Sequence, residues 1–302
     1  MSSTMPWHAG ARRVQERVGE AHLADRLAAG IRTEVPPDGA AFLGELPQVV
    51  VASTDADGLV WVTALTGPPG FLAVPTPDVL TIAANPGDGD PLRAALAAPA
   101  HVGLLGLEPA TRTRVRLNGR SAPIDGDGDG GAGLEVALDE VFGNCPKHIV
   151  PRVVVDDEGA TSSAARSTRG LDDDLAARLA AADTVFVGTT DGQGRADASH
   201  RGGPPGFVEV VDATHLRFPD YRGNSMYQTL GNVDAHPAIG LLVPDWSTGA
   251  ALHLTGWAEI DFEPSPALRE RFPRAPRIVT VELDGAIDRP AAFPLRWWSR
   301  PD

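Results

Sequence analysis

Short stretches of alternating apolar and polar residues, separated by turn residues, dominate the chain. Thr214-His215-Leu216-Arg217-Phe218 alternates as a strand with one buried face does, and Pro219, which lacks an N–H group, is expected to end it. Asp55-Ala56-Asp57-Gly58 and Asp191-Gly192-Gln193-Gly194 are typical of hairpin turns. The 27 prolines and 33 glycines suit many short strands. The pattern predicts a mainly β (α+β) fold built of barrels rather than of an open parallel sheet.

Helical periodicity is confined to a few segments. Residues 9–31 carry an apolar stripe at helical spacing, and Pro36 and Pro37 then break the chain. Further short helices are predicted at 40–46 and 134–142. The N-terminal helical arm is expected to pack across a barrel rather than on a membrane, because its polar face is mixed in charge.

The chain repeats itself at an offset of 136 to 137 residues. Gly67-Pro68-Pro69-Gly70-Phe71 recurs at 203–207, residues 49–55 resemble 185–191, and Leu117-Asn118-Gly119 matches Leu254-Thr255-Gly256. A repeat this long predicts two copies of one small β domain rather than a solenoid. The predicted organisation is an N-terminal helical arm (1–44), a first domain (45–155), a linker (156–180) and a second domain (181–302).

The second copy contains a pattern that suits a phosphate group. Arg222-Gly223-Asn224-Ser225 follows the alternating strand and indicates a turn that feeds a helix, with Asn224 or Ser225 as the N-cap. Free N–H groups at a helix start, a glycine and an arginine together favour an anion. Taken alone, an ordinary capped turn with a solvated arginine explains this stretch equally well.

Two further stretches point in the same direction. One is Asp197-Ala198-Ser199-His200-Arg201-Gly202, and the other is Phe142-Gly143-Asn144-Cys145-Pro146-Lys147-His148-Ile149. In this order the three stretches resemble the pyridoxamine 5'-phosphate oxidase-like, flavin-nucleotide-binding split-barrel family. The resemblance covers most of the chain. Members of this family commonly dimerise with the flavin between two barrels, so together with the internal repeat the resemblance implies two tandem split β-barrels that form a pseudo-dimer, with FMN between them.

The resemblance also implies which residues hold the cofactor. The FMN phosphate falls between one strand and the turn after the next strand. The predicted cofactor-binding residues are Ser199, His200, Arg201, Gly202, Asp220, Tyr221, Arg222, Gly223, Asn224 and Ser225, with Asn144, Cys145 and Lys147 from the first copy. No catalytic residue is assigned, because split-barrel enzymes often need no protein acid or base. Pyridoxamine phosphate oxidases place an Arg-Lys pair where this chain has Ser225-Met226, which argues against that substrate.

The first copy differs at the corresponding positions. Asn85-Pro86-Gly87-Asp88 replaces the turn, and Ala64-Leu65-Thr66 replaces His200-Arg201-Gly202. An aspartate repels a phosphate dianion and an apolar residue offers it nothing. We therefore expect one competent site, in the second copy, with the first copy as its wall. Arg112, Arg114 and Arg116 are candidate wall residues, although a solvated strand face is an equally good interpretation of them.

Composition and charge narrow the classes of function. A net charge of −14 argues against nucleic acid or an anionic membrane as partner. A single cysteine excludes an internal disulfide framework. The sequence lacks a long apolar run and a signal-peptide pattern, which predicts a cytoplasmic protein.

Other candidate motifs are weaker. Residues 125–130 open like an EF-hand loop, but the twelfth position is Val136 instead of glutamate, so a flexible acidic loop is favoured and no metal is predicted. Cys145 beside Lys147 is a candidate nucleophile, and a structural or cofactor contact is the preferred interpretation. The chain has no Gly-x-Ser-x-Gly elbow and no Gly-x-Gly-x-x-Gly fingerprint, so neither a hydrolase triad nor a Rossmann unit is expected.

The predicted function is that of an FMN-dependent oxidoreductase acting on a small molecule, with NAD(P)H or a reductase as the electron donor. Tyr221, Tyr227, Trp297 and Trp298 are candidates to line the flavin space. The alternative is a non-catalytic flavin-binding or storage module, or an electron-transfer partner of a reductase. A deazaflavin or FAD could replace FMN, although the acidic first copy disfavours a long polyanionic tail. The pseudo-dimer is expected as a monomer or a homodimer.

Overall fold

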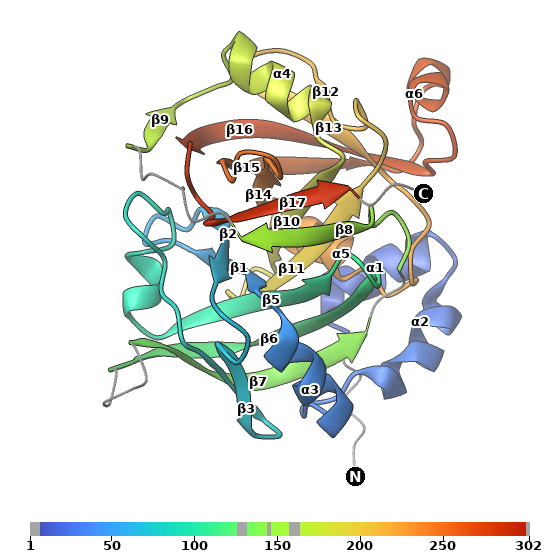
Figure 1. Ribbon diagram of the computed structural model, residues 1–302. Coiled ribbons are helices and arrows are strands. Elements are labelled where there is room, and N and C mark those ends of the chain that lie inside the picture. The colour runs from blue at the N-terminus through green and yellow to red at the C-terminus, as the bar shows by residue number, and fades with distance from the viewer. Residues whose placement is uncertain (1–6, 126–131, 144–145, 157–163, 300–302) are drawn as a thin grey trace.

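The chain is mainly β, as its pattern predicted (Figure 1). The computed structural model describes residues 7–125, 132–143, 146–156 and 164–299. Most strands belong to two antiparallel sheets, and β8 (Arg152–Asp156) pairs with β17 (Leu295–Ser299) in a separate small sheet. Within the described residues, no helix combines the length and the apolar character needed to cross a bilayer.

The two large sheets have corresponding strand orders, β2-β1-β5-β6-β7-β4-β3 and β11-β10-β14-β15-β16-β13-β12. The strands of the first sheet are β1 (Gln48–Thr54), β2 (Val60–Thr66), β3 (Leu72–Thr76), β4 (Val79–Ile82), β5 (Ala100–Glu108), β6 (Thr113–Ile124) and β7 (Gly133–Gly143). Those of the second are β10 (Thr184–Thr190), β11 (Ala196–Gly202), β12 (Glu209–Val210), β13 (His215–Asp220), β14 (Ala238–Pro244), β15 (Ala251–Asp261) and β16 (Arg277–Arg289). β9 (Arg166–Thr168) pairs with β16.

The correspondence extends to a local irregularity. The register shifts at Asn118/Gly119 between β6 and β7, and at Thr255/Gly256 between β15 and β16. A Cβ atom on Gly119 or on Gly256 would lie 2.1 Å from a carbonyl oxygen of the neighbouring strand. Only glycine therefore fits either bulge, which explains why it occurs at both positions.

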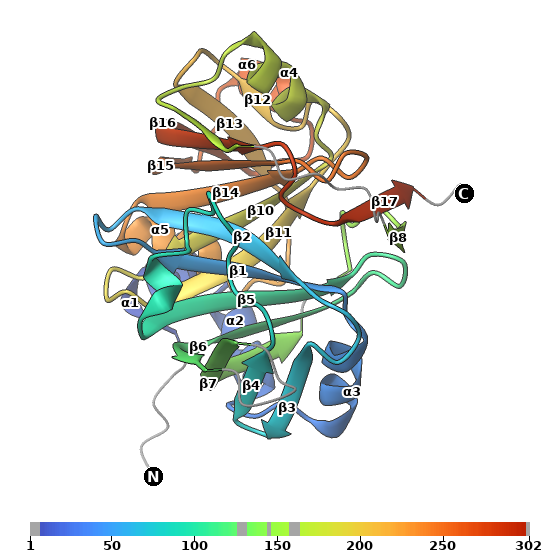
Figure 2. The ribbon, with the colours of Figure 1, turned by 60° about the vertical axis from the view of Figure 1, so that its left-hand side comes forward.

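The two halves pack against each other through the faces of β1, β2, β10 and β11 (Figure 2). Val50, Val62, Phe186, Ala198 and Leu242 belong to one buried cluster with contributions from both halves. Each half has a further apolar core of its own. The two sheets thus share one apolar interface.

The N-terminal arm is two helices instead of the single one predicted. α1 (Ala9–Arg17) ends before Gly19, which has a φ of 73°, and α2 (Ala21–Leu27) follows, with a short 3-10 turn, η1 (Ala28–Gly30), after it. A glycine in the left-handed region is a common helix terminator, and the apolar spacing did not reveal it. α1 packs on α5 (Gln228–Ala235) so closely that a Cβ on Gly10 would lie 2.1 Å from the carbonyl oxygen of Gly231.

Of the two other predicted helices, one is present and one is wrong. α3 (Pro37–Glu45) covers most of the segment predicted at 40–46. The segment predicted as a helix at 134–142 is strand β7, paired with β4 and β6. Leu134, Val136 and Leu138 are buried and alternate with exposed residues, as in a strand. The apolar residues of this segment fit the spacing of a helix as well as that of a strand, so the sequence alone did not decide between them.

The domain boundaries stay a prediction. The segment predicted as a linker, 156–180, includes β9 and most of α4 (Asp173–Ala181). Leu175 and Leu179 of α4 are buried in the core of the second half. By its packing α4 belongs with the second half. The remaining helices are a 3-10 turn η2 (Ala95–Ala97) and α6 (Pro266–Arg271).

Candidate functional site

The second sheet curls until strands from its two ends approach each other. β11 is the last strand at one end and β13 is next to last at the other. The Arg201 guanidinium on β11 nevertheless lies 3.7 Å from the Asp220 carboxylate at the end of β13. Asp220 also accepts a hydrogen bond of 2.8 Å from Arg277 on β16. The strand that carries Ser199 to Gly202 is thereby brought beside the segment between β13 and α5.

A cleft of about 880 Å³, counting its open mouth, lies at this junction. Leu105, Arg114, Arg116, Lys147 and His148 of the first half form one wall, and β11 with the segment after β13 forms the other. The wall residues Arg114 and Arg116 are on strand β6, as predicted, whereas Arg112 is in the preceding turn with a φ of 56°.

The charged residues around the cleft are predominantly basic. Arg114, Arg116, Lys147, Arg201 and Arg222 line it, against Asp220 as the one carboxylate among its lining residues. The chain as a whole carries a charge of −14, so this excess of positive charge is local. It also corrects the expectation that the first half presents an acidic wall. The reason is that the acidic residues of that half lie elsewhere, and the strand register turns Arg114 and Arg116 toward the cleft.

Of the predicted cofactor-binding residues, all that the structure describes line this cleft. They are Ser199, His200, Arg201, Gly202, Asp220, Tyr221, Arg222, Gly223, Asn224, Ser225 and Lys147. Asn144 and Cys145 lie outside the described residues. The structure thus brings together residues that are far apart in sequence, while their contact with a ligand stays a prediction.

His200 is buried and uncharged in this environment. Desolvation by burial lowers the pKa of its imidazole well below the usual value, and the nearby Arg114 and Arg201 lower it further. Arg114 lies 3.4 Å from the His200 Nδ1 atom and is placed to donate to it. With Nδ1 as acceptor, the neutral ring carries its proton on Nε2. His200 therefore adds a hydrogen-bond donor without a charge.

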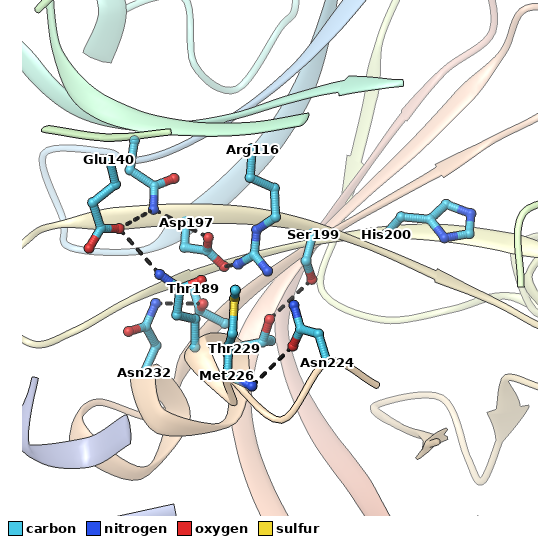
Figure 3. A network of polar contacts seen from close by, with 12 residues as sticks. Arg116, Glu140, Thr189, Asp197, Ser199, His200, Asn224, Met226, Thr229 and Asn232 are labelled. Atoms are coloured by element: carbon cyan, nitrogen blue, oxygen red, sulfur yellow. Dashed lines mark hydrogen bonds and ion pairs between the residues drawn. The ribbon is translucent and has the colours of Figure 1, made fainter. Parts of the chain in front are cut away.

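A polar network behind the cleft fixes both walls (Figure 3). Arg116 forms a buried ion pair with Asp197 of β11. Asn118 donates to Glu140 at 2.9 Å and to Asp197 at 3.4 Å, and Gln228 of α5 donates to Glu140 at 3.2 Å. His200 points away from this network (Figure 3). The network joins strands of the first half to β11 and α5 of the second.

Two hydrogen-bonding groups at the cleft bear on ligand binding. The Nε atom of Arg116 is buried and has no hydrogen-bond partner among the described residues. Thr229 donates to the Ser199 hydroxyl oxygen at 3.1 Å, which leaves the Ser199 proton available to donate elsewhere. A buried donor without a partner is costly, so an acceptor near Arg116 would be favoured.

The turn itself differs from the prediction in three respects. β13 continues through Pro219 to Asp220. At Pro219 the strand is paired with β16 on one side only, because its pairing with β12 ends at Arg217, so the missing N–H interrupts no hydrogen bonds to β12. α5 begins at Gln228, later than predicted, and its N-cap Tyr227 provides no side-chain cap. Asn224 instead accepts from the backbone N–H of Met226 at 3.1 Å.

An unexpected acidic residue contacts this turn. Glu20, between α1 and α2, accepts hydrogen bonds of 2.7 Å from the hydroxyls of both Ser225 and Tyr227. The Arg222 guanidinium is 4.0 Å from it and is 79% exposed. The Ser225 hydrogen bond lowers the pKa of Glu20 despite partial burial. Burial, and after it the hydrogen bond to Glu20, raise the pKa of Tyr227 to about 12. The Ser225 hydroxyl is thus committed to Glu20.

Aromatic residues border the cleft at one side. The rings of His148 and Tyr221 stack at 4.8 Å with an angle of 13° between them, which joins the first half to the turn. Tyr221 and Tyr227 line the cleft, as predicted. Trp297 and Trp298 are not among its lining residues: Trp297 is buried against Trp246, and Trp298 is 59% exposed.

The corresponding region of the first half is filled by side chains from both halves. Asp90, in the loop after β4, accepts hydrogen bonds from Thr63 and, at 2.7 Å, from Arg289. His253, the counterpart of Arg116 at the offset of 137 residues, is buried, and desolvation lowers its pKa to about 4. Ala64 and Leu65 are buried in apolar clusters. The cation of this region, Arg289, is already paired with Asp90, and Ala64 and Leu65 are apolar, so the region is not expected to bind an anion.

A second cavity lies beyond the Arg116–Asp197 pair and measures about 1400 Å³ with its mouth. The arm, the first sheet and α5 border it, and Gln228 lines both cavities. Burial raises the pKa of Glu140 at its edge, against the hydrogen bond from Asn118. Most of the EF-hand-like loop lies outside the described residues, and within the described part of the chain no cluster of three or more metal-binding side chains occurs.

Comparison with known protein families gives a match for the second half of the chain. Residues 171–293 match the family model described as pyridoxamine 5'-phosphate oxidase. Over this segment the chain is similar to that family. The match contains both stretches that form the second-half wall of the cleft, and it confirms the resemblance recognised from them. A search of curated proteins found no match.

Several solved structures are distantly similar. A putative pyridoxamine 5'-phosphate oxidase from Lactobacillus delbrueckii is 16% identical over 39% of this chain and 94% of its own, with a TM-score of 0.33. An F420 reductase is 19% identical over 40% and 94%, with a TM-score of 0.26. A FAD-binding protein from Mesorhizobium loti is 11% identical over 41% and 97%, with a TM-score of 0.27. Similarities this low do not bear on the function of the chain.

Some residues of the site escaped sequence reasoning. Glu20 is 205 residues from its partner Ser225, and no local pattern connects an arm helix with that turn. The ion pairs of Arg277 with Asp220 and of Asp197 with Arg116 depend on how the strands pair, which the sequence does not show. Gln228 and Thr229 come within four residues of the predicted turn at 222–225, so the predicted helix start was the signal that could have included them.

Proposed function

We propose that the chain is an FMN-dependent oxidoreductase that acts on a small molecule and holds the FMN phosphate in the basic cleft. In this proposal the two sheets are tandem split barrels that form a pseudo-dimer, and the second barrel provides the phosphate site. The excess of basic residues around the cleft of a strongly acidic chain is the observation that carries the proposal. The family match over residues 171–293 supports it.

The residues of the cleft suit a phosphate. Arg201 and Arg116 provide guanidinium groups. The Arg116 Nε atom has no partner within the described part of the chain, and a phosphate oxygen would supply one. Ser199 can donate its hydroxyl proton, and Lys147 adds a charge from the first half. Arg222 is exposed at the mouth of the cleft, so solvent screens its charge. It should help to attract the anion but contribute little to the affinity of the bound complex.

The chemistry would be that of the cofactor. FMN, when bound, supplies the electron or hydride transfer, and the protein orients it and shields it from water. Asp220 is paired with Arg277, and burial lowers the pKa of His200 so far that its neutral ring is a weak proton acceptor, so neither residue is well suited to act as a base. The residues of the cleft therefore bind and orient, and we assign no proton transfer to them.

The first test is the identity of the cofactor. The purified protein should be yellow, and mass spectrometry of the extracted cofactor should give FMN; the basic first-half wall makes FAD and deazaflavins real alternatives. A protein that neither retains nor binds any flavin would contradict the proposal.

The second test separates an enzyme from a flavin-binding or storage module. NAD(P)H, or a reductase with NAD(P)H, should bleach the bound flavin, and air should restore it. Failure of every electron donor to reduce the bound flavin would instead support the non-catalytic module. Size-exclusion chromatography with light scattering would show whether the pseudo-dimer is a monomer or pairs again.

A further inference from the structure

The turn at the cleft contains two residues in an uncommon backbone conformation. Ser225 has a φ of 60° and Tyr227 a φ of 58°, and neither is glycine. Side chains disfavour this left-handed region, so residues stay there only when the surrounding structure holds them. Such positions are often found at functional sites.

Both residues are held by the same carboxylate oxygen. The Ser225 and Tyr227 hydroxyls each donate to the Glu20 Oε2 atom at 2.7 Å. One acceptor thereby fixes the side chains on either side of Met226, whose own N–H is bound to Asn224. Hydrogen bonds to an ionised acceptor are stronger than those between neutral groups.

Glu20 contacts the turn from behind. It is not among the residues that line the cleft, and it borders a separate hollow with Arg17, Phe262 and Arg277. The close contact between Gly10 of α1 and Gly231 of α5 holds the arm in place. The carboxylate therefore supports the turn without occupying the space for a ligand.

We propose that Glu20 is a positioning residue, which holds Ser225 and Tyr227 so that the turn presents its cleft-facing groups to the FMN phosphate. This inference rests on the proposed function. It also couples the N-terminal arm to the site, because the turn keeps its conformation only while the arm is docked. By linkage, a ligand that binds the ordered turn stabilises the docked arm.

The test compares two ligands that differ in the phosphate alone. FMN and riboflavin are titrated by flavin fluorescence against the wild type, Glu20→Ala, Glu20→Gln and the control Glu16→Ala, which alters an exposed carboxylate on the same arm. Glu20→Ala should weaken FMN binding on the order of tenfold and leave riboflavin binding unchanged. Glu20→Gln keeps an acceptor oxygen and should restore FMN binding to within about threefold. Glu16→Ala should have no effect.

Three results would overturn the inference. Equal losses for FMN and riboflavin would indicate a general structural role. Unchanged FMN affinity would remove the positioning role, and tighter binding by Glu20→Ala would mean that the carboxylate competes with the phosphate.

Amide hydrogen exchange tests the same contact without a ligand. Exchange at residues 222–227 should be on the order of tenfold faster in Glu20→Ala than in Glu16→Ala. If the wild type bound no flavin, the proposed function would fail, and the exchange rates would still decide whether Glu20 orders the turn. Unchanged exchange would refute it.

Discussion

Replacing Arg201 by alanine removes the best-placed cation of the cleft without leaving a buried charge unpaired. Asp220, its partner at 3.7 Å, keeps two contacts of 2.8 Å with Arg277, so the fold should survive the change. A half-buried guanidinium that binds a phosphate contributes about 1.5–3 kcal/mol, which corresponds to about 10- to 150-fold in Kd. Arg222 is 79% exposed, so Arg222→Ala should weaken FMN binding less than about fivefold.

The assay is an FMN titration of both variants, with thermal unfolding as the check on folding. Arg93→Ala is a matched control, because Arg93 is an exposed arginine of the first half that pairs only with the exposed Asp88 among the described residues. Arg201→Ala should have a much higher Kd for FMN than Arg222→Ala, and Arg93→Ala should have the Kd of the wild type. A folded Arg201→Ala variant with a Kd within twofold of the wild type would refute the reasoning.

Three further outcomes follow from the structure. Arg289→Ala leaves the buried Asp90 carboxylate without its cation and should cost about 3–5 kcal/mol in denaturant unfolding, with FMN affinity per folded molecule unchanged. Glu140→Gln should raise stability at pH 8 more than at pH 5, because burial raises the pKa of Glu140 and the ionised form is disfavoured above that pKa; an equal gain at both pH values would contradict this. Gly10→Ala should undock the arm, seen as faster proteolysis of residues 7–30, since its Cβ would lie 2.1 Å from the Gly231 carbonyl oxygen.

The sequence was sufficient for the fold class and for most of the cleft. Alternation and turn residues indicated a mainly β chain, and the internal repeat agrees with the matching strand orders of the two sheets. Arg201 and Arg222 were found because their neighbours form recognisable stretches. Local patterns of this kind survive because strands and turns impose fixed spacings.

The remainder depended on contacts between distant segments. The strand β7 was taken for a helix because its apolar residues satisfy both periods, and only pairing with β4 and β6 decides between them. The helix start was misplaced because two non-glycine residues, Ser225 and Tyr227, adopt left-handed conformations that propensity disfavours. Glu20 was missed because its effect is exerted across 205 residues of sequence.

The central claim, that the second half holds a flavin phosphate in its basic cleft, is tested most directly by a crystal structure of the FMN complex. The account predicts phosphate oxygens within hydrogen-bonding distance of Arg201 and Ser199, with the ring between the two halves. A phosphate bound in the second cavity, or at the first-half region beside Asp90 where Arg289 reaches across, would contradict it.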